Sequence, residues 1–183
     1  MNEERSQSPI SFAVNVARLP QKGIWVKFEA DSAQRGELAG DHGLLSVDKL
    51  QAEFMVTPWR RNGVKVAGRV SADIVQSCVV TLDPLAVHID EAVEGLFLPE
   101  GSKLGRQGFG QAGEILIDAD GPDSPETFSG DSVDVGALAE QFFALAIDPY
   151  PRKPGAQLAA SGEEAEPAEH EFQQKLRSLL GKS

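Results

Sequence analysis

One stretch of the chain, residues 130–155, predicts a short helix that other structure must cover. Its apolar residues recur every third or fourth position, and further apolar residues widen the stripe: Val135, Leu138, Ala139, Phe142, Phe143, Leu145, Ala146 and Ile147. We therefore expect burial over most of its circumference. Asp134 is the expected N-cap, and Pro149 should end the helix, because a residue before proline avoids helical geometry. A helix with so little polar surface needs a sheet or another helix to pack on.

Alternating apolar and polar residues before this helix predict β-strands, which would supply that surface. The clearest pair covers residues 50–56 and 64–74, joined through Asn62-Gly63, which tolerates the positive φ angles of a tight hairpin turn. Gly68, inside the second strand, indicates a bulge or a close approach of the backbone. Other strands are expected at residues 10–16, 24–28, 87–97 and 115–117, a short helix at 32–40 capped by Asp31 or Ser32, and an acidic loop at 118–131.

Hairpin connections dominate, and the chain shows no regular alternation of strands with helices. We therefore predict an α+β fold with a mostly antiparallel β-sheet, open or barrel-like, covered by one main helix. A narrow apolar stripe predicts a C-terminal amphipathic helix through Phe172, Leu176, Leu179 and Leu180. The expected organisation is a disordered tail (1–8), a single domain (9–155), an acidic flexible linker (156–168) and the C-terminal helix (169–183).

Composition narrows the class of protein. A chain of 183 residues can bury a substantial hydrophobic core, and no apolar run approaches the roughly 20 residues of a membrane span. Cys78 is the only cysteine, so an internal disulfide is impossible. The first residues are polar and acidic, unlike those of a signal peptide. We therefore expect a cytoplasmic protein that makes no contact with a membrane.

The net charge of −11 is concentrated in one part of the sequence. Residues 107–151 contain no Lys or Arg and nine acidic residues: Glu114, Asp118, Asp120, Asp123, Glu126, Asp131, Asp134, Glu140 and Asp148. A field of this sign repels phosphate groups and attracts basic partners. The block is therefore either a solubilising surface or a binding surface for a basic protein.

Residue types that support catalysis are sparse. The three histidines, His42, His88 and His170, have no companion at metal-ligand spacing, and no nucleophile or phosphate-loop motif occurs. Cys78 has no cation near it in sequence to lower its pKa, which indicates a small buried side chain rather than a reactive thiol. We therefore predict a protein that is not an enzyme and that has no metal and no cofactor.

Aromatic and basic residues gather at two places in the sequence. The first group surrounds the Asn62-Gly63 turn and consists of Trp59, Arg60, Arg61, Lys65 and Arg69. Such a group could bind single-stranded RNA by base stacking and phosphate pairing. The alternative is a charged hairpin that resists edge-to-edge pairing. The second group follows the main helix, among three prolines, and consists of Tyr150, Arg152 and Lys153.

Three segments in this order resemble the signatures of one family, the YceD-like proteins. Residues 68–84, GRVSADIVQSCVVTLDP, resemble its central signature. Residues 133–151, VDVGALAEQFFALAIDPYP, are similar to its second signature, a D-L-x-x-L…L-x-L-P-x-x-P helix, and residues 172–182 to its closing F-x-x-L-x-x-L segment. The family is known as the large ribosomal RNA subunit accumulation proteins. The resemblance therefore implies a role in making or stabilising large-subunit ribosomal RNA, without a known enzymatic activity.

The chain departs from this family at one position that could bind metal. Many members have C-x-x-C in the central signature, and several carry further cysteines after the second, a plausible zinc set. Here Cys78 matches the first position, Thr81 occupies the second, and residues 152–183 contain no cysteine. One thiolate cannot form a structural zinc site, which usually takes four ligands, so we predict that this chain binds no zinc.

The residues and the resemblance together favour a non-enzymatic factor for large-subunit ribosomal RNA accumulation, or ribosome biogenesis, that binds RNA or a ribosomal precursor. The acidic block keeps a second hypothesis open, an acidic module that binds a basic ribosomal protein. A hydrolase of unknown substrate is a remote third hypothesis. A deep pocket with converging polar groups would revive it.

Overall fold

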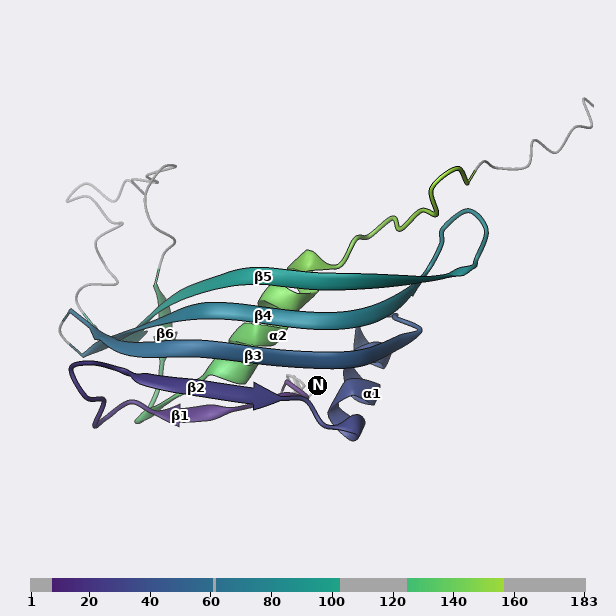
Figure 1. The fold of residues 1–183 in the computed structure, drawn as a ribbon. Helices are drawn as coiled ribbons and strands as arrows, with labels where there is room; N and C mark the ends of the chain where they lie inside the picture. The colour runs from purple at the N-terminus through teal and green to yellow at the C-terminus, as the bar shows by residue number, and fades with distance from the viewer. Residues whose placement is uncertain (1–7, 61, 103–124, 157–183) are drawn as a thin grey trace, which may run out of the picture.

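The computed structural model describes residues 8–60, 62–102 and 125–156 (Figure 1). Several predictions lie outside the described residues. They concern the strand at 115–117, the tail before residue 8, Arg61, and the linker and C-terminal helix beyond residue 156.

The centre of the fold is a sheet whose strands lie in the order β2-β3-β4-β5-β6. Its strands are β2 (Ile24–Glu29), β3 (Ser46–Trp59), β4 (Gly63–Ser77), β5 (Pro84–Pro99) and β6 (Glu126–Phe128). The first four pair antiparallel with their neighbours, whereas β6 pairs parallel with β5. A separate two-stranded sheet joins β1 (Ala13–Asn15) to β7 (Ser132–Asp134). The predicted α+β fold with a mostly antiparallel sheet is confirmed.

Alternation of apolar and polar side chains explains the long hairpin of β3 and β4. The two strands pair along their length as far as Trp59 opposite Gly63, and Asn62 in the turn has a φ of 62°, as the Asn-Gly sequence predicts. Gly68 lies opposite Phe54, where an added Cβ would collide with the Glu53 carbonyl oxygen and with Phe54 itself. The close approach of the backbone predicted at Gly68 is therefore confirmed.

The central sheet has an apolar inner face and a polar outer face. The inner face contributes fully buried side chains to the core, among them Leu50, Phe54, Val66, Val70 and Ile74. The outer face carries charged side chains that pair across neighbouring strands, among them Lys27, Glu53, Lys65, Glu94, Arg69 and Asp90. The helix α2 (Val135–Ala146) lies on the inner face and contacts β4 and β5 (Figure 1).

The ends of α2 agree with the sequence, and its surface is buried or partly buried except along one stripe. Asp134 is the N-cap, and the helix ends at Ala146, before Pro149. Phe143 is fully buried, whereas Leu145 is 77% exposed. The exposed residues of α2, Ala137, Gln141 and Leu145, are spaced four apart and form one stripe. Most of the circumference is therefore buried or partly buried, as predicted, and among the predicted apolar residues only Leu145 is exposed.

The short helix predicted at residues 32–40 is α1 (Ser32–Asp41). Asp31 caps it by accepting hydrogen bonds from the backbone N–H groups of Ala33 and Gln34, and the Gln34 side chain accepts one from the Asp31 N–H. α1 packs on β3 and fully buries Leu38. Neither helix of the described residues has the length and apolar character that crossing a membrane requires.

Three local expectations differ from the structure. The first strand is shorter than the expected range of residues 10–16, because β1 spans only Ala13–Asn15. The acidic loop expected at residues 118–131 contains β6. A strand as short as β6 has no alternation to detect, and its pairing with β5 depends on backbone that is distant in sequence. Among the described strands the sheet stays open, with β2 and β6 at its edges, so the barrel-like alternative is not found.

Candidate functional site

The turn between β3 and β4 places an arginine beside an aromatic ring. Arg60 and Asn62 both have left-handed backbone conformations, with φ of 48° and 62°. The guanidinium carbon of Arg60 lies 4.6 Å from the centroid of the Trp59 ring, which is a cation–π geometry. Within the described part of the chain, no carboxylate forms an ion pair with Arg60. The turn therefore exposes a cation that its described neighbours leave unneutralised.

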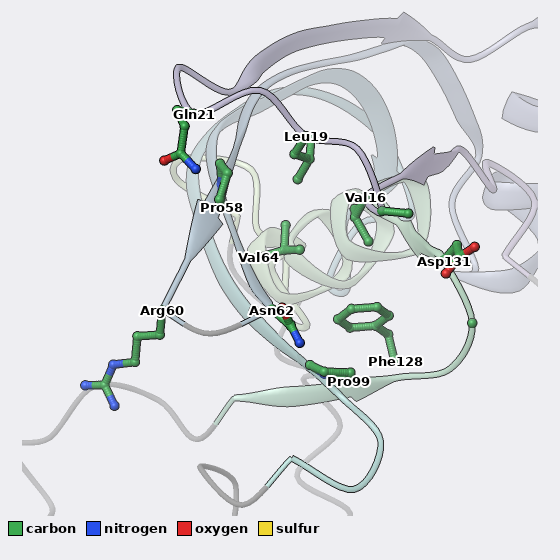
Figure 2. Close-up of a pocket in the computed structure, with 13 residues that line it drawn as sticks. Val16, Leu19, Gln21, Pro58, Arg60, Asn62, Val64, Pro99, Phe128 and Asp131 are labelled. Carbon is green, nitrogen blue, oxygen red and sulfur yellow. The ribbon is translucent and has the colours of Figure 1, made fainter.

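A cavity of about 480 Å³ lies beside this turn (Figure 2). Its walls come from the β3–β4 turn, the segment between β1 and β2, the end of β5 and the residues after β6. Leu19, Val64 and Phe128 point into the space, and the side chain of Arg60 extends away from it (Figure 2). Asp131 lies on the opposite side of the cavity from Arg60 (Figure 2).

A cavity with both apolar and polar lining residues, next to a cation, suits a flat ring that carries a phosphate. Proteins recognise unpaired RNA bases largely by stacking them on flat side chains, and Arg binds the phosphate oxygens. The carboxylate of Asp131 repels phosphate, so an RNA strand would enter from the side of Arg60. This end of the sheet is therefore a candidate site for an unpaired nucleotide.

Lys65 and Arg69 lie on the outer face, where each is neutralised by an acidic residue of β5. The Nζ atom of Lys65 is 2.7 Å from Oε1 of Glu94. Arg69 binds the Asp90 carboxylate through two nitrogens, at 2.8 and 2.7 Å. The hydrogen bond from Arg69 holds the pKa of Asp90 below its usual range. These two members of the predicted basic group therefore do not join Arg60 in one basic surface.

The second predicted group lies at the opposite end of the sheet, beside the β4–β5 turn (Figure 1). Tyr150 and Arg152 are exposed there. The Nζ atom of Lys153 is 3.1 Å from Oδ2 of Asp83, and the hydrogen bond from Lys153 keeps the pKa of Asp83 below its usual value. The two predicted groups therefore do not converge on one site.

Cys78 is fully buried beneath the segment that leaves α2. Its Sγ atom accepts a hydrogen bond from the Lys153 N–H at 3.4 Å, and the Val79 N–H donates to the Pro151 carbonyl oxygen at 2.9 Å. Hydrogen bonds from the Thr81 side chain and from the Lys153 backbone lower the pKa of the Cys78 thiol to about 6. The sequence predicts the burial. It gives no sign of the lowered pKa, because only the fold directs the Thr81 side chain and the N–H of Lys153, 75 positions away, at the sulfur.

The surroundings of Cys78 do not fit a zinc site. Its sulfur already accepts hydrogen bonds from Thr81 and Lys153, whereas zinc usually takes four protein ligands. Within residues 8–60, 62–102 and 125–156, no three His, Cys, Asp or Glu side chains gather as a metal site would need. That the whole chain binds no zinc stays a prediction.

The two described histidines both contact carboxylates. The Nε2 atom of His42 is 3.1 Å from Oε1 of Glu140, and Nδ1 of His88 is 2.7 Å from Oδ1 of Asp73. A histidine that activates a nucleophile needs a hydroxyl or thiol within hydrogen-bond reach. The contacts of His42 and His88 are instead typical of hydrogen bonds that hold elements together.

The comparison with protein families gives a match that begins in β4 and continues through α2. The family model described as large ribosomal RNA subunit accumulation protein YceD matches residues 66–179, which is more than half of the sequence. The matched residues include most of β4, all of β5 and α2, and the Cys78 turn. Arg60 and the rest of its turn precede them. Neither the curated proteins nor the solved structures give a match.

Proposed function

Because the chain belongs to the family of large ribosomal RNA subunit accumulation proteins, we propose that it acts in the accumulation of large-subunit ribosomal RNA. In this proposal it works without catalysis, by binding RNA or a ribosomal precursor at the turn between β3 and β4. Family membership supports the process. The geometry of the turn, which precedes the matched residues, supports the contact surface. A cytoplasmic location fits this role and is part of the proposal.

The main support for the contact surface is the Arg60 guanidinium on the Trp59 ring. Lys65, Arg69 and Lys153 are each held by a carboxylate, whereas Arg60 and Arg152 have no such partner among the described residues, and Arg60 also lies over an aromatic ring. A guanidinium group binds phosphate oxygens strongly, and the adjoining cavity offers the apolar side chains of Leu19, Val64 and Phe128 to a base. Arg60 is therefore the residue we assign to the RNA backbone.

The proposal that the protein is not an enzyme has support from the reactive side chains of the described residues. His42 and His88 contact carboxylates rather than a nucleophile. Cys78 is fully buried, and its sulfur accepts hydrogen bonds instead of facing a cavity. Cys78 therefore has no access to substrate, and the contacts of His42 and His88 are with carboxylates rather than with a hydroxyl or thiol that they could activate.

The variant Arg60→Glu tests the contact surface, alone and combined with Arg61→Glu. It should weaken binding to single-stranded RNA and to large-subunit precursors, because an attraction to phosphate becomes a repulsion. Each lost phosphate contact should also reduce the slope of log K against log salt by about 0.7. Equilibrium binding across a salt series and co-sedimentation with ribosomal precursors measure the two effects.

Lys49→Glu is the matched control for this experiment. Lys49 is also exposed on β3, near the opposite end of the strand, about 30 Å from Trp59 at roughly 3.3 Å per residue. Lys49→Glu changes the charge by the same amount as Arg60→Glu, so a general electrostatic effect would weaken RNA binding by both variants equally. Wild-type binding by Arg60→Glu would contradict the proposed surface.

A second candidate is an acidic module that binds a basic ribosomal protein, and the acids beside the same cavity favour it. Asp131 lines the cavity, and Glu126 is exposed on β6 at the same end of the sheet. Other acids of the block already have partners, since Asp134 caps α2 and Glu140 contacts His42. Asp131 and Glu126 are therefore the acids that a basic partner would contact.

A further inference from the structure

Trp25 is a large aromatic side chain exposed on the polar outer face of the sheet. It lies on β2, opposite Met55 of β3, and 72% of its surface is accessible to solvent. Its strand neighbours Ile24, Val26 and Phe28 face the core side and are partly or fully buried. An indole ring that contributes so little to the core is available for a contact with another molecule.

A groove of about 390 Å³ crosses the outer face next to this ring. Trp25 forms one side of it, from β2, and the ion pair of Arg69 and Asp90 forms the other, from β4 and β5. Gln51 and Ser71 lie between these two sides, and their side chains are smaller than those of Trp25 and Arg69. The groove therefore combines a flat apolar wall with polar groups on the floor and on the opposite wall.

The charges of this groove suit the edge of a base better than a phosphate group. Arg69 is bound to Asp90 through two nitrogens, and Glu53 is paired with Lys27, so the groove offers no free positive charge. Carboxylate, amide and hydroxyl groups remain to accept or donate hydrogen bonds. Carboxylates accept hydrogen bonds from the amino groups that adenine, cytosine and guanine carry and uracil lacks.

We propose that an unpaired RNA base stacks on Trp25, with its polar edge in the groove between Trp25 and the Arg69–Asp90 pair. This inference rests on the proposed function and adds a base-binding surface to the phosphate contact at Arg60. Met55, opposite Trp25, precedes Trp59 by four positions on β3, which corresponds to about 13 Å at roughly 3.3 Å per residue. A short single strand can therefore reach both places.

The variant Trp25→Ala tests the stacking contact. It should weaken the binding of a single-stranded RNA roughly 12 nucleotides long by about five- to a hundredfold, the range expected for one base stack. Trp25→Phe keeps an aromatic ring and should retain most of the affinity. Leu82→Ala is the matched control, because Leu82 is similarly exposed, at 76%, in the β4–β5 turn at the other end of the sheet. Thermal unfolding checks that all three variants are folded.

Tryptophan fluorescence gives a second readout that does not depend on affinity alone. The chain has two tryptophans, so Trp59→Phe leaves Trp25 as the only emitter. The single-stranded RNA should quench this emission, and free guanosine monophosphate should do so at higher concentration. An uncharged oligosaccharide should leave it unchanged. Quenching by the oligosaccharide and not by the nucleotide would overturn the proposal in favour of a carbohydrate site.

The outcomes separate this inference from the proposed function. If Trp25→Ala binds RNA as tightly as wild type while Arg60→Glu binds more weakly, the stacking proposal is wrong and the proposed function stands. If wild-type protein binds no single-stranded RNA, the stacking proposal and the RNA contact at Arg60 are both wrong, and only binding to a ribosomal precursor through protein is left of the proposed function. A loss of affinity in Trp25→Ala but not in Leu82→Ala, together with quenching of Trp25, supports the base-stacking site.

Discussion

At the scale of single residues, Phe143 and Leu145 have opposite surroundings although they are two positions apart on α2. Phe143 is fully buried, with its ring 5.5 Å from the His42 ring, and Leu145 faces solvent. Phe143→Ala should lower the free energy of unfolding by about 3–5 kcal/mol, because it leaves a cavity. Leu145→Ala should change it by less than about 0.5 kcal/mol. Urea unfolding measures both values, and equal losses would contradict this orientation of α2.

Arg69 shows which properties of a residue cannot be predicted from the sequence. Alternation along its strand correctly predicts that Arg69 points away from the core. Its partner Asp90 is 21 positions away and comes close only because β4 and β5 pair in a register that sets Ser71 opposite Asp90. Register depends on the whole buried face and on the turn, so the neutralisation of Arg69 was not predictable from its neighbours. The groove beside Trp25 likewise needs side chains from four strands.

At the scale of elements, one carboxylate joins the start of α2 to the N-terminal segment. Asp134 accepts hydrogen bonds from the N–H groups of Gly136 and Ala137, from the hydroxyl of Ser11 and from the N–H of Phe12. Burial on its own would raise the pKa of Asp134, but these hydrogen bonds outweigh it and hold the pKa below its ordinary value. The charged form of Asp134 therefore stabilises the folded state.

Asp134→Asn should remove this stabilisation while keeping a side-chain oxygen at the cap. The expected loss at neutral pH is about 1–2 kcal/mol, the difference between hydrogen bonds to charged and to neutral groups. A folded-state pKa below the unfolded value of about 3.9 gives stability that is present above pH 4 and lost as the pH falls through the folded pKa. The advantage of wild type over Asp134→Asn should therefore shrink between pH 7 and pH 3 in urea unfolding. A constant advantage would rule out a role for ionisation.

The elements that the sequence predicts best are those with local signals. The β3–β4 hairpin follows from alternation and Asn62-Gly63, and the starts of α1 and α2 follow from Asp31 and Asp134. By contrast, β6 consists of three residues and pairs with the end of β5 across a long stretch of chain. No local pattern distinguishes such a strand from a loop, so the sequence does not predict the parallel pairing.

At the scale of the whole molecule, the sheet separates two regions that the sequence presents as similar basic groups. β4 has 15 residues and therefore spans about 50 Å, from the Arg60 turn to the turn that holds Cys78. The turn at Trp59 and Arg60 was predictable from its Asn-Gly sequence and its composition. The cavity beside it was not, because Leu19, Val64 and Phe128 come from parts of the chain that only the fold brings together.

The cavity at this end of the molecule has a cation on one side and an anion on the other, so a single experiment can distinguish RNA from a basic protein as its partner. RNA would contact Arg60, and a basic ribosomal protein would contact Asp131 and Glu126. In pull-downs of large-subunit precursors, the proposed function predicts that nuclease treatment removes the bound material. It also predicts that Asp131→Asn combined with Glu126→Gln binds at least as well as wild type, since two charges that repel phosphate are gone.

The acidic-module hypothesis predicts the reverse on both counts. A ribosomal protein would stay bound after nuclease treatment, and the Asp131→Asn, Glu126→Gln variant would lose it, while Arg60→Glu would bind it as well as wild type or better. Because the two hypotheses place opposite charges on the partner, each charge-changing variant should shift binding in opposite directions under the two of them. Retention after nuclease treatment together with loss in the acid-neutralised variant would therefore replace RNA with a basic protein as the partner at this end of the sheet.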